Sequence, residues 1–276
     1  MYKARLKLIV SSIAVVFFIC IVIFPFYWLL VSSLKSPGEI FSSSQTIFPI
    51  EITLENYISV FKGTALLRYF LNSTIISVST VTLVIFIGSM AAYAISRYYF
   101  RGKIAFFLII LISQMLPITT LIIPLYMFWG KLHMLNSYAS IILTYSGFLI
   151  PIAIWLLTSY FNRIPKEVDE SALIDGCSPF MVLFRIILPQ AMPGIIAASL
   201  CIFISVWQEL MIAMTFISDD SMRTLPAGIL TFITSQGIKW GPVTAAGFLT
   251  CIPVIILFVF LQKTLISGLT EGAIKG

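Results

Sequence analysis

Six apolar stretches, each long enough to cross a lipid bilayer, limit what this chain can fold into. A helix that spans the hydrocarbon core needs about 20 mostly apolar residues. The stretches run roughly over Leu8–Leu34, Phe70–Ile95, Ile104–Trp129, Tyr138–Tyr160, Met192–Ile217 and Val243–Ile266. The sequence therefore predicts an all-α polytopic membrane protein with six transmembrane helices, forming one transmembrane domain over residues 1–276.

The composition supports a membrane environment and argues against a nucleic-acid partner. Hydrophobic residues make up 59% of the chain and charged residues 10%, whereas soluble proteins carry about 25% charged residues. The net charge of +6 comes without a run of Lys or Arg. These basic residues are better interpreted as signals that orient the chain in the membrane. We expect membrane lipid, and no nucleic acid, among the partners.

The polar side chains provide no pattern typical of a catalytic or metal site. Four cysteines are scattered along the chain without a CxxC motif, and three of them lie within apolar stretches. The single histidine, His133, has no HExxH or GxSxG motif nearby. A membrane-embedded hydrolase is therefore disfavoured, and neither disulfides nor a metal site are expected. The sequence predicts a non-catalytic protein.

The first apolar stretch follows Lys3, Arg5 and Lys7, as in a secretory signal. Its apolar core is too long for a signal peptide, and no A-x-A cleavage site follows it. We expect an uncleaved first span.

The distribution of Lys and Arg predicts the orientation of the spans. With the N-terminus inside, the inner segments hold eleven basic residues and the outer loops hold six. The positive-inside rule therefore places both termini in the cytoplasm. The segment 163–190, between the fourth and fifth spans, is then cytoplasmic, and the longest polar loop, at about 35–69, lies outside.

The segment 163–190 begins with the pattern of a short helix. Pro165 suits the first position of a helix. Glu167, Asp169 and Glu170 would lie in its first turns, where the helix dipole favours negative charge. Gly176 is placed to end the helix in a left-handed conformation.

A second short helix is predicted directly after this turn. Ser178 and Pro179 form an N-cap followed by a proline at the first helical position. Pro189 is expected to end the helix. Between them an apolar stripe is formed by Phe180, Leu183, Phe184 and Ile187, which are spaced i, i+3, i+4 and i+7.

The spacing in this segment resembles the EAA loop of ABC importer permeases. Glu170-x-Ala172 is followed by Gly176 and then, after nine intervening residues, by Ile186-x-Leu188-Pro189. Ser171 stands where the family usually has Ala, a small-for-small change. The stretch AAYAISRYYFRGK (91–103), the Asn72-Ser73 pair, Trp207-Gln208-Glu209 and the terminal GLTEGAIKG resemble the second permease subunit of carbohydrate importers of the maltose-transporter type.

This resemblance implies a multi-subunit importer in a bacterial or archaeal cytoplasmic membrane. The expected partners are a second permease subunit, two cytoplasmic ABC ATPase subunits and an extracytoplasmic sugar-binding protein. The chain has no GxxxxGK[ST] loop. We therefore expect it to bind no cofactor itself, with ATP and Mg held by the partner ATPase.

The resemblance also implies that the segment 163–190 docks as a helix-turn-helix in a cleft of the ATPase. The apolar stripe would fill the cleft, and Glu170 would pair with a basic residue there. The tail Gly268–Gly276 would also reach toward the ATPase, or would be a frayed end. The residues expected to couple the permease to the ATPase are Glu170, Ala172, Asp175, Gly176, Phe180, Phe184, Ile186, Leu188 and Pro189.

Few polar groups lie deep in the predicted spans, and each one is a candidate for the substrate pathway. Glu209 is an acid within the fifth span, beside Gln208 and Trp207. A charge there is costly unless it faces water or a partner. The three side chains would line a sugar pathway or form hydrogen-bonding contacts between helices. Gln114 is a further candidate, close to Pro117, which together with Pro124 is expected to kink the third span.

Other functions remain open on the sequence. The loop 35–69 and residues 218–242 would receive the binding protein or act only as spacers. Importers of glycerol phosphates, and permeases for amino acids, share the EAA loop. An ion-coupled secondary transporter is a further alternative, although a single buried acid is weak support for it.

Overall fold

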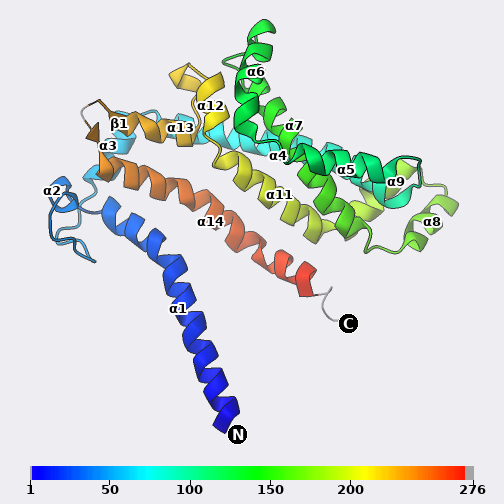
Figure 1. The fold of residues 1–276 in the computed structure, drawn as a ribbon, viewed down its shortest axis with the longest axis horizontal. Coiled ribbons are helices and arrows are strands. Elements are labelled where there is room, and N and C mark those ends of the chain that lie inside the picture. The colour runs from blue at the N-terminus through cyan, green and yellow to red at the C-terminus, as the bar shows by residue number, and fades with distance from the viewer. Residues whose placement is uncertain (1, 236, 271–276) are drawn as a thin grey trace. The chain divides into compact units, whose positions relative to one another are not determined.

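The computed structural model describes residues 2–235 and 237–270, with side chains over residues 10–235 and 237–264. It is built almost entirely from helices (Figure 1). The longer helices are α1 (Tyr2–Ser33), α3 (Glu55–Gly63), α4 (Leu66–Arg97), α5 (Lys103–Ser113), α6 (Ile118–Lys131), α7 (Tyr138–Phe161), α8 (Lys166–Ile174), α11 (Met192–Trp207) and α14 (Trp240–Thr270). The short helices are α2 (Pro37–Ile40), α9 (Pro179–Val182), α10 (Leu188–Gln190), α12 (Met211–Phe216) and α13 (Leu225–Ile229).

Four of these helices are long and apolar enough to cross a membrane by themselves. They are α1 from Val10 onward, α4, α7 and α14 as far as Thr264. Two bent pairs of helices also pass the same test of length and apolarity: α5 with α6, and the helical run Pro179–Gln190 with α11. If each pair is one span, the described residues contain six spans, the number that the sequence predicts. The second pair differs in position from the predicted fifth span, because it begins at Pro179, inside the segment 163–190, and ends at Trp207.

The third predicted span, Ile104–Trp129, is not one continuous helix. Its two halves, α5 and α6, meet at an angle of 91°. The break lies between Gln114 and Pro117, which caps the start of α6. Proline has no amide hydrogen, and it disfavours helical backbone in the residue before it. The predicted kink is thus a full break at Pro117, while Pro124 lies inside α6.

The fifth predicted span, Met192–Ile217, is also divided. Helix α11 ends at Trp207, and the separate short helix α12 begins at Met211. At its other end, α11 meets the preceding helical run at 84°. The polar pair Gln208-Glu209 lies at this division, and it was the signal that the sequence offered for a break.

By its internal contacts the chain divides into two compact units. The first unit holds the described residues up to Leu67 together with Gly228–Pro253. The second holds Arg68–Ala227 and the described residues from Val254 onward. The prediction of one domain over the whole chain stays a prediction.

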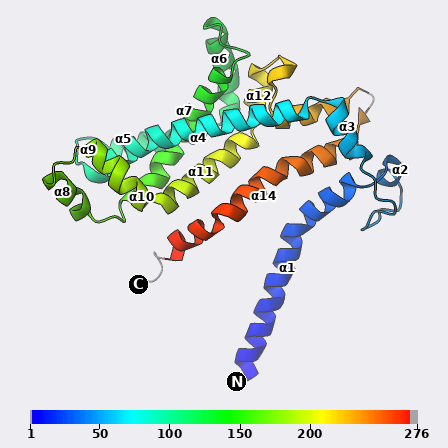
Figure 2. The same ribbon diagram turned by 180° about the vertical axis from the view of Figure 1, so that it is seen from behind.

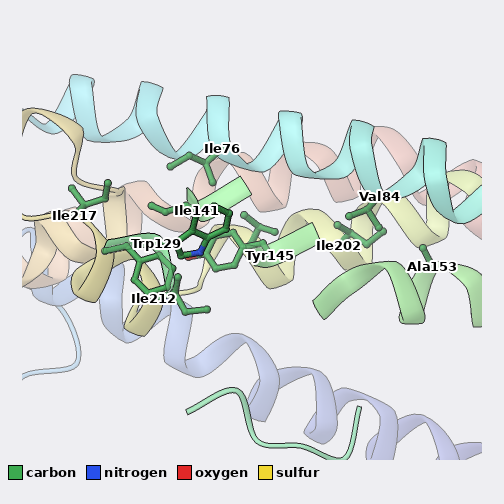
Figure 3. Packing of buried hydrophobic residues seen from close by; sticks show 11 residues of the cluster. Ile76, Val84, Trp129, Ile141, Tyr145, Ala153, Ile202, Ile212 and Ile217 are labelled. Atoms are coloured by element: carbon green, nitrogen blue, oxygen red, sulfur yellow. The ribbon is translucent and has the colours of Figure 1, made fainter. Parts of the chain in front are cut away.

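Helix α7 lies at the centre of the second unit and contributes to two buried apolar clusters. One cluster joins it to α4, α6, α11 and α12 (Figure 3), and includes Ile76, Trp129, Tyr145, Ile202 and Ile212. The other joins α4 and α7 to α8, α9 and the start of α11. Helices α8 and α9 lie at one end of this unit, well away from α6 and α12 (Figure 2).

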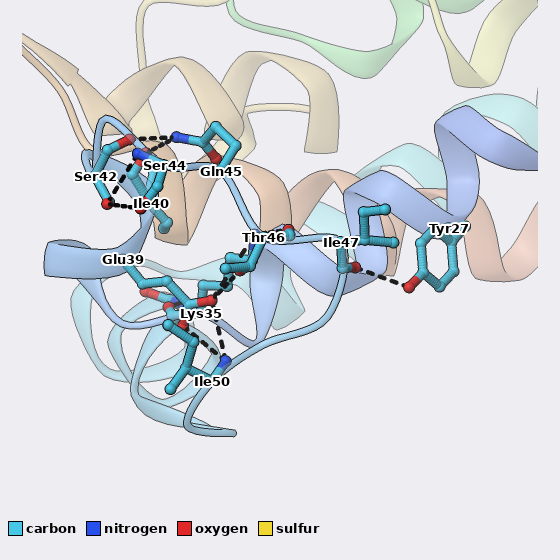
Figure 4. A network of polar contacts seen from close by, with 11 residues as sticks. Tyr27, Lys35, Glu39, Ile40, Ser42, Ser44, Gln45, Thr46, Ile47 and Ile50 are labelled. Carbon is cyan, nitrogen blue, oxygen red and sulfur yellow. Dashed lines mark hydrogen bonds and ion pairs between the residues drawn. The ribbon is translucent and has the colours of Figure 1, made fainter.

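In the first unit, the part of the predicted outer loop that precedes α4 has a defined fold around a buried lysine (Figure 4). Lys35 is 1% exposed, and its Nζ donates to the carbonyl oxygen of Thr46 at 2.5 Å. The same Nζ lies 3.9 Å from Oε1 of Glu39 and 4.9 Å from the centre of the Trp28 ring. Two strands, β1 (Ile233–Thr234) and β2 (Gly237–Ile238), form a small antiparallel hairpin before α14.

Candidate functional site

The segment 163–190 forms the predicted helix-turn-helix, and the turn depends on Gly176. Helix α8 ends at Ile174, and Gly176 has a φ of +86°, in the left-handed region. Its amide donates to the carbonyl of Leu173 at 3.1 Å, and the amide of Cys177 donates to that of Ala172 at 3.0 Å. This pair of bonds is the Schellman motif, which satisfies the last carbonyls of a helix. The predicted left-handed glycine is confirmed.

The second short helix starts as the sequence indicates. Ser178 is its N-cap, and its Oγ accepts a hydrogen bond from the amide of Met181 at 3.3 Å. Pro179 is the first residue of α9. The prediction for the first helix is wrong by one position, because Pro165 is the N-cap of α8 and Lys166 begins the helix.

Pro189 does not end the second helix, as the sequence had led us to expect. A π-helical turn over Leu183–Ile187 continues from α9 into α10, which runs through Pro189 to Gln190. Proline is tolerated in the first turn of a helix, where an amide hydrogen has no partner to lose. The wider π turn directly before it provides this position. The change of direction comes at Ala191, before α11.

The apolar stripe of the second helix is divided between the inside and the outside of the chain. Leu183 and Ile187 are buried in the cluster with α4 and α7. Phe180 is 57% exposed, and its ring lies 4.4 Å from that of the half-buried Phe184. The expectation that all four residues form one docking face is therefore wrong, because the spans of this chain already cover half of it.

The apolar surface that remains exposed is formed around the turn. Ile174 is 86% exposed, and Leu173, Phe180 and Met181 are also exposed. We call these four side chains the turn surface. The sequence analysis missed Leu173, Ile174 and Met181. The available signal was the apolar pair Leu173-Ile174 in the last turn of the predicted short helix, just before Asp175 and Gly176. Two adjacent residues of a helix point in different directions, so one buried face cannot cover both.

The other residues expected to contact the ATPase differ in exposure. Glu170, Asp175, Gly176 and Pro189 are exposed, Ile186 and Leu188 are half-buried, and Ala172 is buried against the spans. Their coupling roles stay predictions.

A buried ion pair, which the sequence analysis also missed, fastens α8 to the spans. Nε of Arg97, at the end of α4, lies 2.9 Å from Oδ2 of Asp169. The hydroxyl of Tyr93 donates to Oδ1 of the same carboxylate at 2.8 Å, and Nη1 of Arg97 donates to the carbonyl of Phe161 at 3.1 Å. Asp169 is three residues before the buried Ala172, so its position on the inner face of α8 was the available signal.

Glu209 lies at the break between α11 and α12 and is fully engaged by this chain. Its carboxylate accepts a short hydrogen bond from the hydroxyl of Tyr145. It also accepts bonds from the backbone amides of Ile212 at 3.0 Å and Ala213 at 3.4 Å. The acid therefore satisfies the free amides at the start of α12. These contacts favour the helix-contact interpretation of Glu209.

The neighbours of Glu209 and the second candidate, Gln114, lie in different environments. Trp207 is buried between the rings of Phe70 and Phe203, whereas Gln208 is exposed. Gln114 lies at the other helix break, and its Nε2 donates to the carbonyl of Phe148 on α7 at 3.1 Å. Both breaks are thus fastened to α7. A role of these residues in the substrate pathway stays a prediction.

The Asn72-Ser73 pair fastens the far end of α4 to the 219–225 loop. Nδ2 of Asn72 donates to the carbonyl of Arg223 at 2.8 Å, and its Oδ1 accepts from the hydroxyl of Tyr138 at 2.7 Å. Oγ of Ser73 accepts from the amide of Leu225 at 2.7 Å. These bonds explain the residue types at both positions.

Two other sequence expectations concern the tail and metal ligands. In the tail Gly268–Gly276, residues from 271 onward lie outside the described residues. Across the part of the chain that the structure describes, no three His, Cys, Asp or Glu side chains are grouped so that they could hold a metal ion.

Comparison with known proteins identifies relatives along the whole chain. Residues 84–270 match the family described as binding-protein-dependent transport system inner membrane component. The chain is 37% identical to the trehalose/maltose transport system permease protein of Thermococcus litoralis, over 100% of both chains. It is 36% identical to a diacetylchitobiose uptake system permease protein of Streptomyces coelicolor, over 95% of each chain.

A solved structure supports the same fold. A chain of a bacterial ABC transporter involved in the import of the acidic polysaccharide alginate superimposes with a TM-score of 0.81. The match covers 95% of this chain and 98% of the other, at 21% identity. This similarity concerns the fold, and it agrees with a helical membrane protein.

Proposed function

Since the chain belongs to the family of binding-protein-dependent transport system inner membrane components, we propose that it is the permease subunit of an ABC importer that carries a sugar into the cytoplasm. The sugar is a mono-, di- or oligosaccharide. In this family the permease is a non-catalytic membrane subunit, so the energy comes from another protein.

The observation that carries this proposal is the geometry of the segment 163–190. The turn surface, Leu173, Ile174, Phe180 and Met181, is exposed beside the acidic Glu170. Behind it, the ion pair of Arg97 and Asp169 and the buried apolar cluster hold the two short helices against the spans. An exposed apolar surface on a firmly held element suits a partner that must push on the spans.

The partner on this surface is the ATPase. Two ABC ATPase subunits bind ATP and Mg, and this chain binds no cofactor. A second permease subunit completes the pathway, and an extracytoplasmic solute-binding protein delivers the sugar. Closure of the ATPase pair on ATP moves α8 and α9, and the buried ion pair transmits this motion to α4.

The proposed location is the cytoplasmic membrane of a bacterium or archaeon, with both termini in the cytoplasm. The segment 163–190 then faces the ATPase, and the loop 35–69 faces the binding protein. In that loop the exposed apolar side chains include Phe48 and Ile50, at 72% and 76% exposure. Such side chains suit a protein partner better than a solvated spacer.

The sugar is inferred from the relatives, which are permeases named for trehalose/maltose and diacetylchitobiose. Permeases for glycerol phosphate or amino acids are the alternative within the same mechanism, and ion-coupled transport is the alternative outside it.

Two measurements test the proposal. Cysteine at the exposed Glu170 should react with an impermeant thiol reagent only from the cytoplasm, and cysteine at the exposed Glu51 only from outside. In proteoliposomes that contain the complete transporter and its binding protein, sugar uptake should require ATP. Labelling of position 170 from outside would overturn the orientation, and uptake driven by a proton or sodium gradient alone would overturn the mechanism.

A further inference from the structure

The first unit contains an open pocket, lined in part by the loop 35–69, to which no ligand has been assigned above. It has a volume of about 350 Å³ and is formed by the residues around α2, α3 and the start of α14. Pockets for small molecules have volumes of about 300–1,000 Å³ and combine apolar walls with a few placed polar groups. This pocket is therefore at the small end of that range.

Two exposed aromatic rings line the pocket. Phe41, directly after α2, is 68% exposed, and Trp240, the first residue of α14, is 46% exposed. Aromatic side chains of this size are costly to leave in water, and Trp can also donate a hydrogen bond. Their flat faces suit a ligand that has a flat apolar face of its own.

Polar groups lie on the same pocket wall. Glu55 and Ser59 are four residues apart on α3, so both project from one face of that helix. Lys239 contributes a positive charge to the same pocket lining that contains the negative charge of Glu55. The pocket therefore offers hydrogen bonds of both kinds with no excess charge, which favours an uncharged ligand with several hydroxyl groups.

The pocket is held in shape before any ligand arrives. Nδ2 of the buried Asn56 donates to the carbonyls of Ser33 at 2.9 Å and Lys35 at 2.8 Å, which fastens α3 to the end of α1. A Cβ at position 241 would lie 2.1 Å from Oδ1 of Asn56, so only glycine allows α14 to approach this closely. When a ligand binds to a preformed pocket, few side chains and loops have to be ordered, so less of the binding free energy is lost.

We propose that this pocket is an accessory binding site for an uncharged saccharide on the outer surface of the transporter. The C–H face of a sugar ring packs on Trp240, with Phe41 beside it. The sugar hydroxyls donate to the carboxylate of Glu55, exchange hydrogen bonds with the hydroxyl of Ser59 and accept from the ammonium group of Lys239. This inference rests on the proposed function, because it takes the class of ligand from the sugar that the transporter carries.

The experiment uses the complete transporter. Uptake into proteoliposomes first establishes whether trehalose or diacetylchitobiose is carried with ATP and binding protein. The carried sugar, radiolabelled, is then the probe in equilibrium dialysis against the transporter in nanodiscs without binding protein. The variants are Trp240→Ala, Trp240→Phe and Glu55→Gln. The matched control is Phe61→Ala, which removes an equally exposed ring of α3 that lies outside the pocket lining.

We expect direct binding of the sugar to the unmodified transporter and to the Phe61→Ala control. Trp240→Ala and Glu55→Gln should weaken it by about ten-fold or more, as expected for loss of a stacking or charge-assisted contact. Trp240→Phe should retain part of the affinity. A transporter that carries the sugar but does not bind it directly, or binds it equally well in Trp240→Ala, would overturn the inference.

Two further outcomes separate this site from its alternatives. If Trp240→Ala weakens only the affinity for the binding protein, the pocket is a protein docking surface and the saccharide site is excluded. If neither those sugars nor any other neutral sugar is carried with ATP, the proposed function fails first, and the saccharide assignment fails with it.

Discussion

Nε of Arg97 and Oδ2 of Asp169 lie 2.9 Å apart, with 6% and 8% of their side chains exposed. They join the end of a long span to a short helix that the chain presents at its surface. Removing one partner of a buried ion pair leaves the other charge unpaired, at a cost of about 3–5 kcal/mol. Replacing both by apolar residues often costs little.

We therefore predict that Arg97→Leu and Asp169→Leu each lower the thermal stability of the purified subunit, and that the double variant recovers most of the loss. The readout is the melting temperature in detergent by fluorescence-detected gel filtration. Glu170→Gln, one residue away and exposed, is the control and should melt at the unmodified temperature. If the melting temperature of the double variant falls by the sum of the two single decreases, Arg97 and Asp169 are not coupled.

A substitution at Gly176 tests the effect of backbone conformation alone, because a Cβ there would meet no neighbouring side chain. Apart from the two adjoining residues, no heavy atom lies within 4 Å of a Cβ built at this position, and φ is +86°. Gly176→Val should therefore act only through backbone strain, of about 1–3 kcal/mol. Asn visits the left-handed region more readily than other residues, so Gly176→Asn should be milder.

The expected result for Gly176→Val is a normal level of protein in the membrane with weakened binding of the ATPase. Co-purification of the tagged ATPase measures it, with Gly176→Asn as the matched comparison. If both variants and the unmodified chain retain the ATPase equally, the conformation of Gly176 does not position the turn surface for binding.

In the segment 163–190 some apolar residues are exposed and others are buried against the spans, and we predict a different phenotype for each group. Ile174→Asp, at an 86% exposed position, should abolish ATPase binding and leave the melting temperature unchanged. Leu183→Ala, at a 2% exposed position, should lower the melting temperature, because a buried Leu-to-Ala change costs about 2–5 kcal/mol. Co-purification and melting are measured on the same samples. A loss of stability in Ile174→Asp would contradict the exposed position.

Variants of Glu209 can distinguish its two interpretations, which are a hydrogen-bonding contact between helices and a part of the sugar pathway. If it serves to hold α12 and α7 together, Glu209→Gln and Tyr145→Phe should each destabilise the subunit by about 1–3 kcal/mol. The two losses should not add fully, because Tyr145→Phe removes the hydrogen bond that Glu209→Gln weakens by removing the charge. Melting of the single and double variants measures this. A changed KM for uptake with unchanged melting would instead indicate contact with the sugar.

The loop around Glu39 should respond to acid. The hydrogen bond from Thr46, aided by the amide of Ile50 and the charge of Lys35, holds the pKa of Glu39 below its ordinary value of 4.5. A lowered pKa in the folded state stabilises the fold above the ordinary value, and this stability is lost as the pH falls through the lowered pKa. The loop should therefore loosen below about pH 4.5.

The fluorine NMR signal of fluorotryptophan at Trp28, which lies under Lys35, reports this change. Glu39→Gln should shift the signal at neutral pH and remove its dependence on acid. A titration that persists in Glu39→Gln would assign the acid response to another group.

Local features of this protein were predictable because their causes lie close together in the sequence. The left-handed turn needs only Gly176 at the end of a short helix, and the following helix needs only Ser178 and Pro179 at its start. The apolar stretches follow from hydropathy, since a span must present about 20 apolar residues to lipid. The same local causes suggested the resemblance to ABC importer permeases through the spacing from Glu170 to Pro189.

Tertiary contacts determined what these patterns could not. Leu183 and Phe180 are both apolar, and only the packing of α4 and α7 decides that the first is buried and the second exposed. The sequence does not distinguish Asp169 from the other acids of its helix. Only the fold shows that it pairs with Arg97, which is far away in the sequence. The sequence by itself determined the membrane class, the number of apolar stretches and the turn, but not the breaks within the third and fifth spans. The tertiary structure alone decided which side chains are buried or paired within the chain and which remain exposed for a partner. Burial depends on residues that are distant in the sequence and that only the fold brings together.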